Sequence, residues 1–430
     1  MAKKRIETEI IIVGSGTAGA TLAKELANPG RKVIVIEKGK REEKIGTMQD
    51  GLRFYEKHSF QKSKEGMIIY GTSMVGGTSV VASGNAVRCL QKEFLDFGID
   101  LENQFREAEK ELNAVPLPDK CISEGAKKII EAAEALGLGP KRIPKFINPE
   151  KCIGCGNCVL GCRYGAKWSA INYIDEALKS GASLMTQTKA IKVLNVNGRA
   201  KGIEAVGPEG PVEIIGDIVI IAAGGIQTPI LLQKSGITNA GKKMFCDPFM
   251  STYGITKNLN QTKGVNAPGY VLKSGRFIMF PFIDPPVQFL LHTGWKSLTG
   301  KFPRQRAFGM MTKIADESIG KVDSSGSIQK TISVKDKEKL MEGIALVKEI
   351  FIKAGAGPKS IFTIKQIRGP HPGGTAAIGE IVDNNLETEI KNLFVCDNSV
   401  LPKAPGLPPI LTLIALGKWL SQRLAVRRIN

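Results

Sequence analysis

The sequence predicts an α/β fold that combines a Rossmann-like domain with a second domain of α+β type. Three observations predict it. Residues 10–37 read as an apolar strand, a glycine-rich turn, a helix and another apolar strand. Residues 245–367 change to a pattern of strands followed by one helix. A length of 430 residues, 42% of them hydrophobic, is enough for two or three domain cores.

The N-terminal segment has the order of elements that binds a dinucleotide. Residues 10–13 are an apolar run of the buried-strand type, residues 20–27 have helical character, and a second strand at residues 32–36 ends at Glu37. Glu37 lies 18 residues past Gly19, where an acidic side chain accepts hydrogen bonds from the hydroxyls of an adenosine ribose. Strand, turn, helix and terminal acid are all in register, so we predict a dinucleotide site here.

Each glycine of the Gly14–Gly19 turn has a physical purpose. Gly14 permits the tight turn, Gly16 lets the backbone approach a pyrophosphate, and Gly19 lets the helix pack closely on the strand. The N-terminus of the following helix offers free N–H groups and a favourable dipole to the phosphates.

Two later glycine-rich segments suggest which dinucleotide is bound. Residues 76–88 and 224–237 resemble the first and second signatures of the glucose–methanol–choline (GMC) family of flavoprotein oxidoreductases, the latter almost residue for residue. A departure is Ala82, where many relatives carry an Asn near the flavin. The resemblance implies an FAD cofactor, with candidate contacts at Gly76, Gly77, Thr78, Ser79, Ala223 and Gly224.

The C-terminal run 396–402 resembles the last FAD-binding strand and turn of that family. The resemblance implies that Asp397 lies by the pyrophosphate–ribityl part of FAD. It also implies that the helix from Ile410 directs its N-terminus at the isoalloxazine ring, which makes Pro408 and Pro409 cofactor-binding candidates.

Four of the eight cysteines form a run. Cys152, Cys155, Cys158 and Cys162 have the spacing CxxCxxCxxxC of ferredoxins, in which short loops wrap a cubic cluster. A 4Fe–4S cluster is the favoured interpretation, and zinc or unoccupied thiols are the alternatives, since structural zinc usually has two CxxC pairs with a longer spacer. A disulfide is disfavoured in a reducing compartment.

Only one such run exists, so Cys162 must close its own cluster, or Cys121 or Cys89 must replace it. Arg163 stands where ferredoxins carry a proline. The stretch from Cys155 to Lys167 resembles a long-chain alcohol oxidase-like branch of the family. The isolated cysteines are predicted to be small buried hydrophobes: Cys89, Cys121, Cys246 and Cys396.

The family resemblance also implies a catalytic residue. His371 opens a segment similar to the family's HxxGTxxMG motif, whose histidine takes the hydroxyl proton while a hydride moves to flavin N5. The family usually has His or Asn eleven residues beyond the Asp of its last motif, and the ungapped count from Asp397 gives Pro408, which offers no proton acceptor. His58 and His292 are interpreted as structural.

The predicted organisation is discontinuous. It comprises an FAD-binding domain at 1–90, 182–240 and 385–430, a helical region with a small iron–sulfur insert at 91–181, and a substrate-binding domain with an antiparallel sheet at 241–384. Local patterns add a helix at 101–115, a helix at 124–136 capped by Ser123 and ended by Gly137, a type I′ hairpin at Asn197-Gly198, strands at 276–283 and 287–292, and a helix at 337–353.

Charge and composition limit the partners. The formal net charge is +19, from 60 Lys and Arg against 41 Asp and Glu. This excess suits a solvated surface, an acidic redox partner or an anionic membrane surface. Nucleic acid is disfavoured because the basic residues are scattered and no binding motif accompanies them. With no signal peptide or membrane-length apolar run, the expected location is cytoplasmic.

Taken together, the sequence predicts an FAD-dependent dehydrogenase acting on an alcohol-type substrate. Its electrons would pass through the 4Fe–4S cluster to a protein acceptor such as ferredoxin, because flavin accepts two electrons together and an iron–sulfur centre passes them singly. The alternatives are a ferredoxin-driven reductase of a carbonyl or alkene, and a non-catalytic electron-transfer subunit of a larger redox complex.

Overall fold

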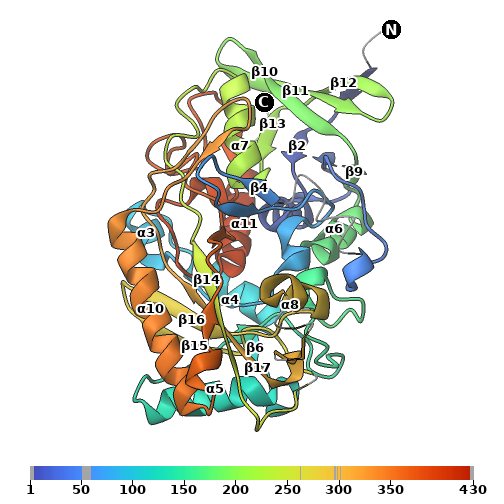
Figure 1. Ribbon diagram of the computed structural model, residues 1–430. Helices are drawn as coiled ribbons and strands as arrows, with labels where there is room; N and C mark the ends of the chain where they lie inside the picture. The colour runs from blue at the N-terminus through green and yellow to red at the C-terminus, as the bar shows by residue number, and fades with distance from the viewer. Residues whose placement is uncertain are drawn as a thin grey trace.

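The computed structural model describes residues 4–50, 60–261, 263–294, 297, 299–300 and 302–426. The chain forms two regions, one above the other in Figure 1. The upper region holds a parallel sheet and a small mixed sheet, and the lower region holds a large, mainly antiparallel sheet flanked by long helices. His58 lies outside the described residues.

The parallel sheet is the Rossmann-like core that the sequence predicts. In the described part of the chain it has the order β22 (Leu393–Val395), β13 (Ile218–Ile221), β2 (Ile10–Val13), β3 (Val33–Ile36) and β9 (Ser183–Met185). Its apolar central strands are buried, since helix α1 (Thr17–Leu26) packs on β2 and β3, and strand β11 (Arg199–Gly207) of a smaller sheet packs on β13. The helices packed around it are α1 (Thr17–Leu26), α4 (Glu102–Glu111), α6 (Ala170–Lys179), α7 (Gly224–Lys234) and α11 (Ile410–Ala425).

A smaller sheet lies at the top of Figure 1, in the order β1 (Lys4–Glu7), β12 (Gly210–Ile215), β11 (Arg199–Gly207) and β10 (Lys189–Val196). The turn between β10 and β11 has φ of 51° at Asn197 and 77° at Gly198. Positive φ at both central residues defines the type I′ hairpin, so that prediction is confirmed.

The large sheet of the lower region gathers strands from three parts of the sequence. Two of them, β4 and β5, fall within residues 1–90, and β7 falls within residues 91–181. Its pairs are antiparallel except that between β21 and β5. Its strands among the described residues are β4 (Phe60–Lys62), β5 (Ile68–Tyr70), β7 (Lys141–Arg142), β14 (Phe249–Ile255), β15 (Gly269–Lys273), β16 (Phe277–Pro281), β17 (Ala307–Lys313), β20 (Phe362–Thr363) and β21 (Arg368–Gly369).

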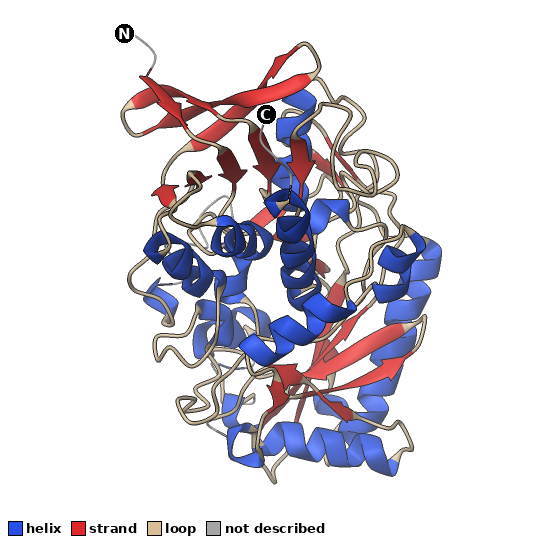
Figure 2. Cartoon of the chain, turned by 180° about the vertical axis from the view of Figure 1, so that it is seen from behind, coloured by secondary structure: helices blue, strands red, loops and turns tan. Residues whose placement is uncertain are grey.

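Two helices cover one face of this sheet. The long helix α10 (Val334–Lys353) packs on β14, β16 and β17, and α5 (Glu124–Ala135) packs on α10 and the sheet. Figure 2 shows both helices against the lower sheet from behind. The Ser123 side chain accepts a hydrogen bond from Ala126 N and caps α5, as predicted.

One predicted strand is wrong. Residues 287–292 are part of helix α8 (Pro286–Thr293). A short apolar run does not distinguish a strand from a helix by its periodicity. Pro285 and Pro286 decide the outcome, because proline at the first helical position has the φ of a helix and needs no hydrogen-bond acceptor for its nitrogen.

The remaining elements are short. The described residues also form α3 (Gln91–Asp96), β6 (Val115–Pro116), β8 (Pro144–Lys145), β18 (Lys321–Val322) and β19 (Ile328–Gln329), and the 3₁₀ helices η1 (Gly77–Val81), η2 (Asp119–Cys121), η3 (Cys158–Leu160), η4 (Arg304–Arg306), η5 (Pro358–Ser360) and η6 (Asn398–Val400). Among the described helices, none is both long enough and apolar enough to cross a membrane.

Candidate functional site

The three glycine-rich segments that the sequence singles out meet at one place. A Cβ atom on Gly14 would lie 2.3 Å from Ala222 O, and one on Gly19 would lie 2.0 Å from Gly14 O. Gly77 approaches Gly16 closely, since its Cβ would lie 3.1 Å from Gly16 Cα. A Cβ on Gly16 itself would meet nothing within 4 Å. The turn is therefore closely packed at Gly14 and Gly19 and open at Gly16. This open space fits a pyrophosphate against Gly16.

Glu37 belongs to the same cradle. Its Oε2 atom accepts hydrogen bonds from Ser15 N at 3.1 Å and Ser15 Oγ at 2.8 Å, and Oε1 accepts one from Gly39 N. Ser15 Oγ also accepts from Gly76 N at 3.2 Å. The carboxylate is thus fixed at the mouth of the glycine turn, where a ribose bound to that turn would lie.

Asp397 lies at the end of β22 and holds the third glycine segment in place. Its carboxylate accepts hydrogen bonds from Gly224 N at 2.8 Å, Thr228 Oγ1 at 2.5 Å and Ser399 N at 2.7 Å. Burial raises the pKa of Asp397, although these donors lower it. Beside it, the buried atoms Asn398 Oδ1 and Ser399 Oγ have no hydrogen-bond partner. Buried polar atoms are normally paired, so a polar group of a cofactor fits there.

His371, which is partly buried, forms a trio with a buried ion pair, Asp247 and Lys313. Its Nδ1 atom is 2.9 Å from Asp247 Oδ2 and 3.2 Å from Lys313 Nζ, and Lys313 Nζ is 3.4 Å from the same Asp247 oxygen. The side chains of Asp247 and Lys313 are 0% and 2% exposed. A carboxylate can only accept, so Nδ1 carries the hydrogen and donates it to Asp247. This leaves the lone pair on Nε2, for which the described residues offer no hydrogen-bond partner.

The electrostatics of the trio keep His371 neutral. Burial and then the Lys313 charge lower the pKa of His371 to about 4, against the opposing effect of Asp247. Burial also lowers the pKa of Lys313, and Asp247 opposes this. An imidazole that is neutral at pH 7 and oriented by a carboxylate can accept a proton at Nε2.

Asp247 also ties the loop before α11 to this trio. Its Oδ1 atom accepts a hydrogen bond from Gly406 N at 2.9 Å. That loop contains Pro408 and ends at Pro409, the N-cap residue of α11. Pro408 is therefore brought into the same region as His371, but its side chain offers neither a donor nor an acceptor.

His292, which the sequence analysis interprets as structural, belongs to a second buried network. Its Nδ1 atom is 2.7 Å from Tyr253 Oη and 2.8 Å from Asp284 Oδ2, and its Nε2 atom is 2.7 Å from Arg368 Nη2. Tyr253 also donates to Asp284. Because these groups satisfy one another, the network suits a structural role for His292, as the sequence predicts.

The four clustered cysteines surround one cavity. Cys152, Cys155, Cys158 and Cys162 all line it, together with Ile147, Val265 and Lys167. The loop can wrap this space because Gly154, Gly156 and Gly161 have φ of 66°, 76° and 96°. Among the described residues, no group of three or more His, Cys, Asp or Glu side chains is arranged to hold a metal ion. The thiols enclose the cavity without converging on one point.

The structure separates the two cysteines that could have replaced Cys162. Cys121 packs against the cavity, beside Cys152. Cys89 instead lies against α11, with its Sγ atom 3.1 Å from Thr412 Oγ1. Cys89, Cys121, Cys246 and Cys396 are all buried, which confirms that prediction.

Two buried lysines lie beside the cysteine cavity. Lys145 is 0% exposed and Lys167 is 6% exposed. Burial lowers the pKa of Lys145 to about 7, and Cys158 and Cys152 counteract this. Burial likewise lowers the pKa of Lys167 and raises that of Cys158. Burial raises the pKa of Cys152 to about 11.

The cysteine loop and the second glycine segment are neighbours. Helix η3 of the loop packs against η1. Lys167 joins them, since its Nζ atom donates to Ser79 O at 3.1 Å and Val80 O at 2.9 Å while the side chain lines the cavity. Ser79 is one of the candidate FAD contacts, whereas Thr78 beside it is exposed.

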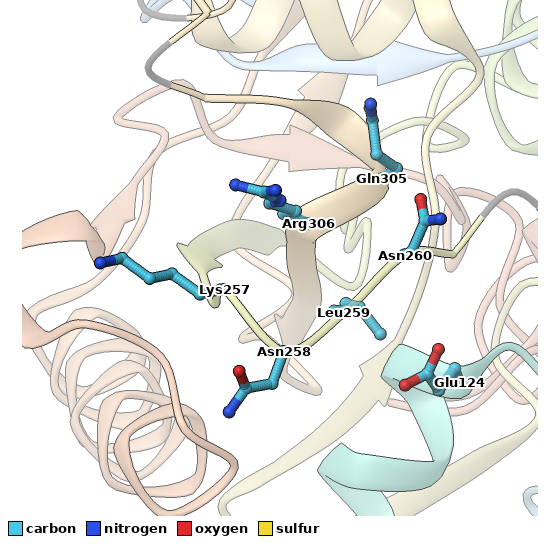
Figure 3. Close-up of a pocket in the computed structure, with 7 residues that line it drawn as sticks. All are labelled: Glu124, Lys257, Asn258, Leu259, Asn260, Gln305 and Arg306. Carbon is cyan, nitrogen blue, oxygen red and sulfur yellow. The ribbon is translucent and has the colours of Figure 1, made fainter.

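A shallow polar pocket on the lower region contains none of the predicted site residues. It is lined by Glu124, Lys257, Asn258, Leu259, Asn260, Gln305 and Arg306. In Figure 3 the side chains of Lys257, Asn258 and Gln305 point in different directions. They do not converge on a common point, so this pocket lacks the arrangement of a catalytic site.

Comparison with known proteins gives a consistent result. Residues 8–262 match the N-terminal family model of GMC oxidoreductase, and residues 326–417 match the C-terminal one. The chain is 32% identical to an uncharacterised protein of Methanocaldococcus jannaschii over 95% of this chain and 98% of that protein. It is 27% identical to a long-chain-alcohol oxidase of Arabidopsis thaliana over 98% of this chain and 68% of that protein.

A solved structure shares the fold. Pyridoxine 4-oxidase from Mesorbium loti superposes with a TM-score of 0.75, covering 98% of this chain and 100% of that chain at 15% sequence identity. At this identity the likeness shows the mixed α/β fold and not the substrate.

Proposed function

Because the chain belongs to the GMC oxidoreductase family, we propose that it is an FAD-dependent dehydrogenase that oxidises an alcohol and passes the electrons through a 4Fe–4S cluster to a ferredoxin-like protein. The single observation that carries the catalytic part is the trio that leaves Nε2 of His371 free. The alcohol donor is supported by the similarity to a long-chain-alcohol oxidase.

FAD, when bound, takes two electrons as a hydride from the carbon that bears the hydroxyl. The residues that would hold it are those of the three glycine segments, Glu37 and the Asp397 turn: Gly14, Gly16, Gly19, Gly76, Gly77, Thr78, Ser79, Ala223 and Gly224. Pro408 and Pro409 would lie where α11 begins. The open side of Gly16 and the unpaired Asn398 Oδ1 support this assignment.

His371 would accept the hydroxyl proton at Nε2. The reaction removes two electrons and two protons from the alcohol and leaves a carbonyl. One proton leaves within the hydride and the other goes to His371. Asp247 orients the imidazole through Nδ1, and Lys313 balances the Asp247 charge so that His371 stays neutral before reaction. Placing a neutral base at the reacting proton typically accelerates such a step by about 10²–10⁴-fold.

The cluster would be held by Cys152, Cys155, Cys158 and Cys162, and it would pass electrons one at a time. A polynuclear cluster spreads its thiolates over several irons, so it needs a cavity between the cysteines, and these four line one. The contact between η3 and η1 supports electron transfer from a flavin held at η1. The net charge of +19 suits an acidic protein acceptor.

A reaction in the opposite direction is the second candidate. The hydrogen bond from Gly406 N to Asp247 brings the loop that contains Pro408 to the active centre. The Pro408 side chain supplies no second proton-transfer group. This favours a reductase that takes electrons from ferredoxin and reduces a carbonyl or alkene. In that direction His371 would have to be protonated first, which its lowered pKa opposes.

One anaerobic experiment tests both parts. Purified protein is analysed for flavin, iron and acid-labile sulfide, and its absorption spectrum is followed during addition of alcohols of increasing chain length or of reduced ferredoxin. The proposal expects about four irons and four sulfides per FAD and bleaching of the flavin by an alcohol. Iron and sulfide near zero would refute the relay. Bleaching by reduced ferredoxin but by no alcohol would favour the reductase.

A further inference from the structure

Lys145 and Lys167 are unusual because both amines are buried and neither meets a carboxylate. Lys145 Nζ donates to Ser83 O at 3.1 Å, to Asn266 O at 2.7 Å and to the Asn85 side chain. Lys167 Nζ donates only to the backbone oxygens of Ser79 and Val80. Within the described ranges, no Asp or Glu lies within ion-pair distance of either lysine.

Among the residues that the structure describes, every other buried lysine has its own counter-charge. Lys313 is paired with Asp247, Lys330 with Asp316 at 2.6 Å, and Lys339 with Asp336 at 2.9 Å. A buried ammonium group without a counter-charge costs folding free energy, and proteins normally avoid it. The buried Lys418 is paired too, with Glu25 at 2.7 Å, so the fold supplies a carboxylate in four places and omits it at the cysteine cavity.

The groups near these two lysines that can become negative are the cysteines. When ionised, Cys158 and Cys152 raise the pKa of Lys145, and Cys158 and Cys162 raise that of Lys167. Without a ligand, a protonated amine at this cavity has no carboxylate to balance its charge. Four thiolates around iron carry a net negative charge, and reduction adds one more. A bound cluster would therefore provide the missing counter-charge.

We propose that Lys145 and Lys167 are the built-in counter-charges of an anionic iron–sulfur cluster, which they retain in the cavity and whose reduction potential they raise. The inference rests on the cluster in the proposed function. Its physical basis is that positive charge nearby favours the reduced, more negative form, and net charge is one of the factors that set cluster potentials. Both lysines are positioning residues, since neither is a ligand.

The geometry gives Lys167 the larger expected effect. The Lys167 side chain lines the cavity itself. Lys145 is not among the lining residues, and its amine donates hydrogen bonds to Asn85 and Asn266. Lys167 also holds the carbonyls of Ser79 and Val80, so it connects the cavity with the segment proposed to hold FAD. Reduction of the cluster should therefore respond more to Lys167 than to Lys145.

The test uses Lys145→Met and Lys167→Met in the full chain, prepared anaerobically. Methionine keeps most of the aliphatic stem and removes the charge. Iron, sulfide and flavin are measured, and the cluster is titrated potentiometrically by electron paramagnetic resonance. We expect equal flavin content and a more negative cluster potential in both variants, with the larger shift for Lys167→Met and the largest in the double variant.

Stability provides a readout that a merely structural role would not produce. In cluster-free protein, prepared by oxidation and chelation, both methionine variants should melt at a higher temperature than the wild type, because an uncompensated buried amine is removed. In cluster-loaded protein they should melt at a lower temperature. The matched control is Lys339→Met, which should lower the melting temperature of both forms and leave the cluster potential unchanged, because Lys339 has Asp336.

The outcomes separate this inference from the proposed function. Wild-type protein without iron and sulfide, or with zinc, overturns the relay and the lysine role together. A cluster whose potential is the same in both methionine variants overturns the lysine role alone. If a methionine variant loses the cluster, Lys167→Arg or Lys145→Arg decides the matter. If the arginine variant retains the cluster, the loss in the methionine variant is due to the missing charge. If the arginine and methionine variants both lose the cluster, the loss is due to packing and the proposal is overturned.

Discussion

The trio around His371 and the cavity around the four cysteines both contain buried lysine. The lysine of the trio has a carboxylate partner, and the lysines at the cavity have none. At the trio, Lys313 has a fully buried carboxylate, Asp247, within 3.4 Å. At the cavity, Lys145 and Lys167 have only neutral oxygens. In the first region, the positive charge of Lys313 is balanced by the negative charge of Asp247. The second has buried amines with no carboxylate beside them, and this observation underlies the proposed role of an anionic cluster.

The comparison also explains why the two regions should fail differently. Removing Asp247 or Lys313 leaves an unbalanced charge in the protein itself, so both stability and proton transfer should suffer. Removing a cysteine takes away a ligand from a cavity whose walls remain, so the fold and the flavin should be spared. The following predictions test that difference.

The largest expected effect is the loss of the cluster in Cys158→Ser. Cys158 is the cysteine that both lysines face, and a serine hydroxyl is a poor ligand for iron. We expect iron and sulfide to fall to background while the flavin is retained and is still reduced by substrate. Cys121→Ala is the matched control, since Cys121 packs beside the cavity but lies outside the run. Iron loss in that control would mean that Cys121 is a ligand.

Replacement of His371 should stop chemistry without emptying either cofactor site. His371→Ala removes the base, and we expect anaerobic reduction of the flavin by substrate to slow by about 10²–10⁴-fold. His371→Gln, whose amide can still donate to Asp247, should be equally slow, which separates the loss of the base from the loss of packing. Stopped-flow absorbance measures the rate, and an unchanged rate in both variants would remove His371 from the reaction.

Asp247→Asn should destabilise the protein by removing the counter-charge of Lys313. The amide keeps an acceptor for Gly406 N but leaves Lys313 buried and unpaired, which costs about 3–5 kcal/mol of unfolding free energy. Adding Lys313→Met should recover much of that loss, as denaturant titrations can measure. This is the opposite of the behaviour expected at the cavity, where Lys167→Met alone stabilises cluster-free protein. A double variant no more stable than Asp247→Asn would contradict the pairing.

The parts of the fold that the sequence predicts correctly are local. The Gly14–Gly19 turn, the Asn197-Gly198 hairpin and the Ser123 cap each depend on a few adjacent residues whose φ values or hydrogen bonds decide the conformation. The strand predicted at 287–292 failed because an apolar run of that length suits either structure, and only the prolines before it indicate a helix.

The candidate site was predictable where one motif contains it. The cysteines lie within eleven residues, and His371 lies in a family segment. Asp247 and Lys313 could not be found in this way, because they lie 124 and 58 residues from His371 in the sequence and meet it only through the folding of the lower sheet. No sequence motif marks Lys145 as part of the site. Lys167 lies in the stretch that resembles the long-chain alcohol oxidase-like branch, but nothing in that stretch indicates that its side chain is buried.

The smallest expected effect is a displacement of the pH profile, and it tests the trio most directly. With a His371 pKa of about 4, set mainly by burial and then by Lys313, the base is neutral from pH 5 upward. The acidic limb of kcat/KM should therefore lie near pH 4 and not near 6.5. Lys313→Met removes the cation that disfavours imidazolium and leaves Asp247 to favour it, so the pKa of His371 rises and the limb moves to higher pH. Lys330→Met, whose amine pairs with Asp316, does not contact His371 and should leave the limb closer to its wild-type position. A limb that stays near pH 4 in Lys313→Met would mean that burial alone holds His371 neutral.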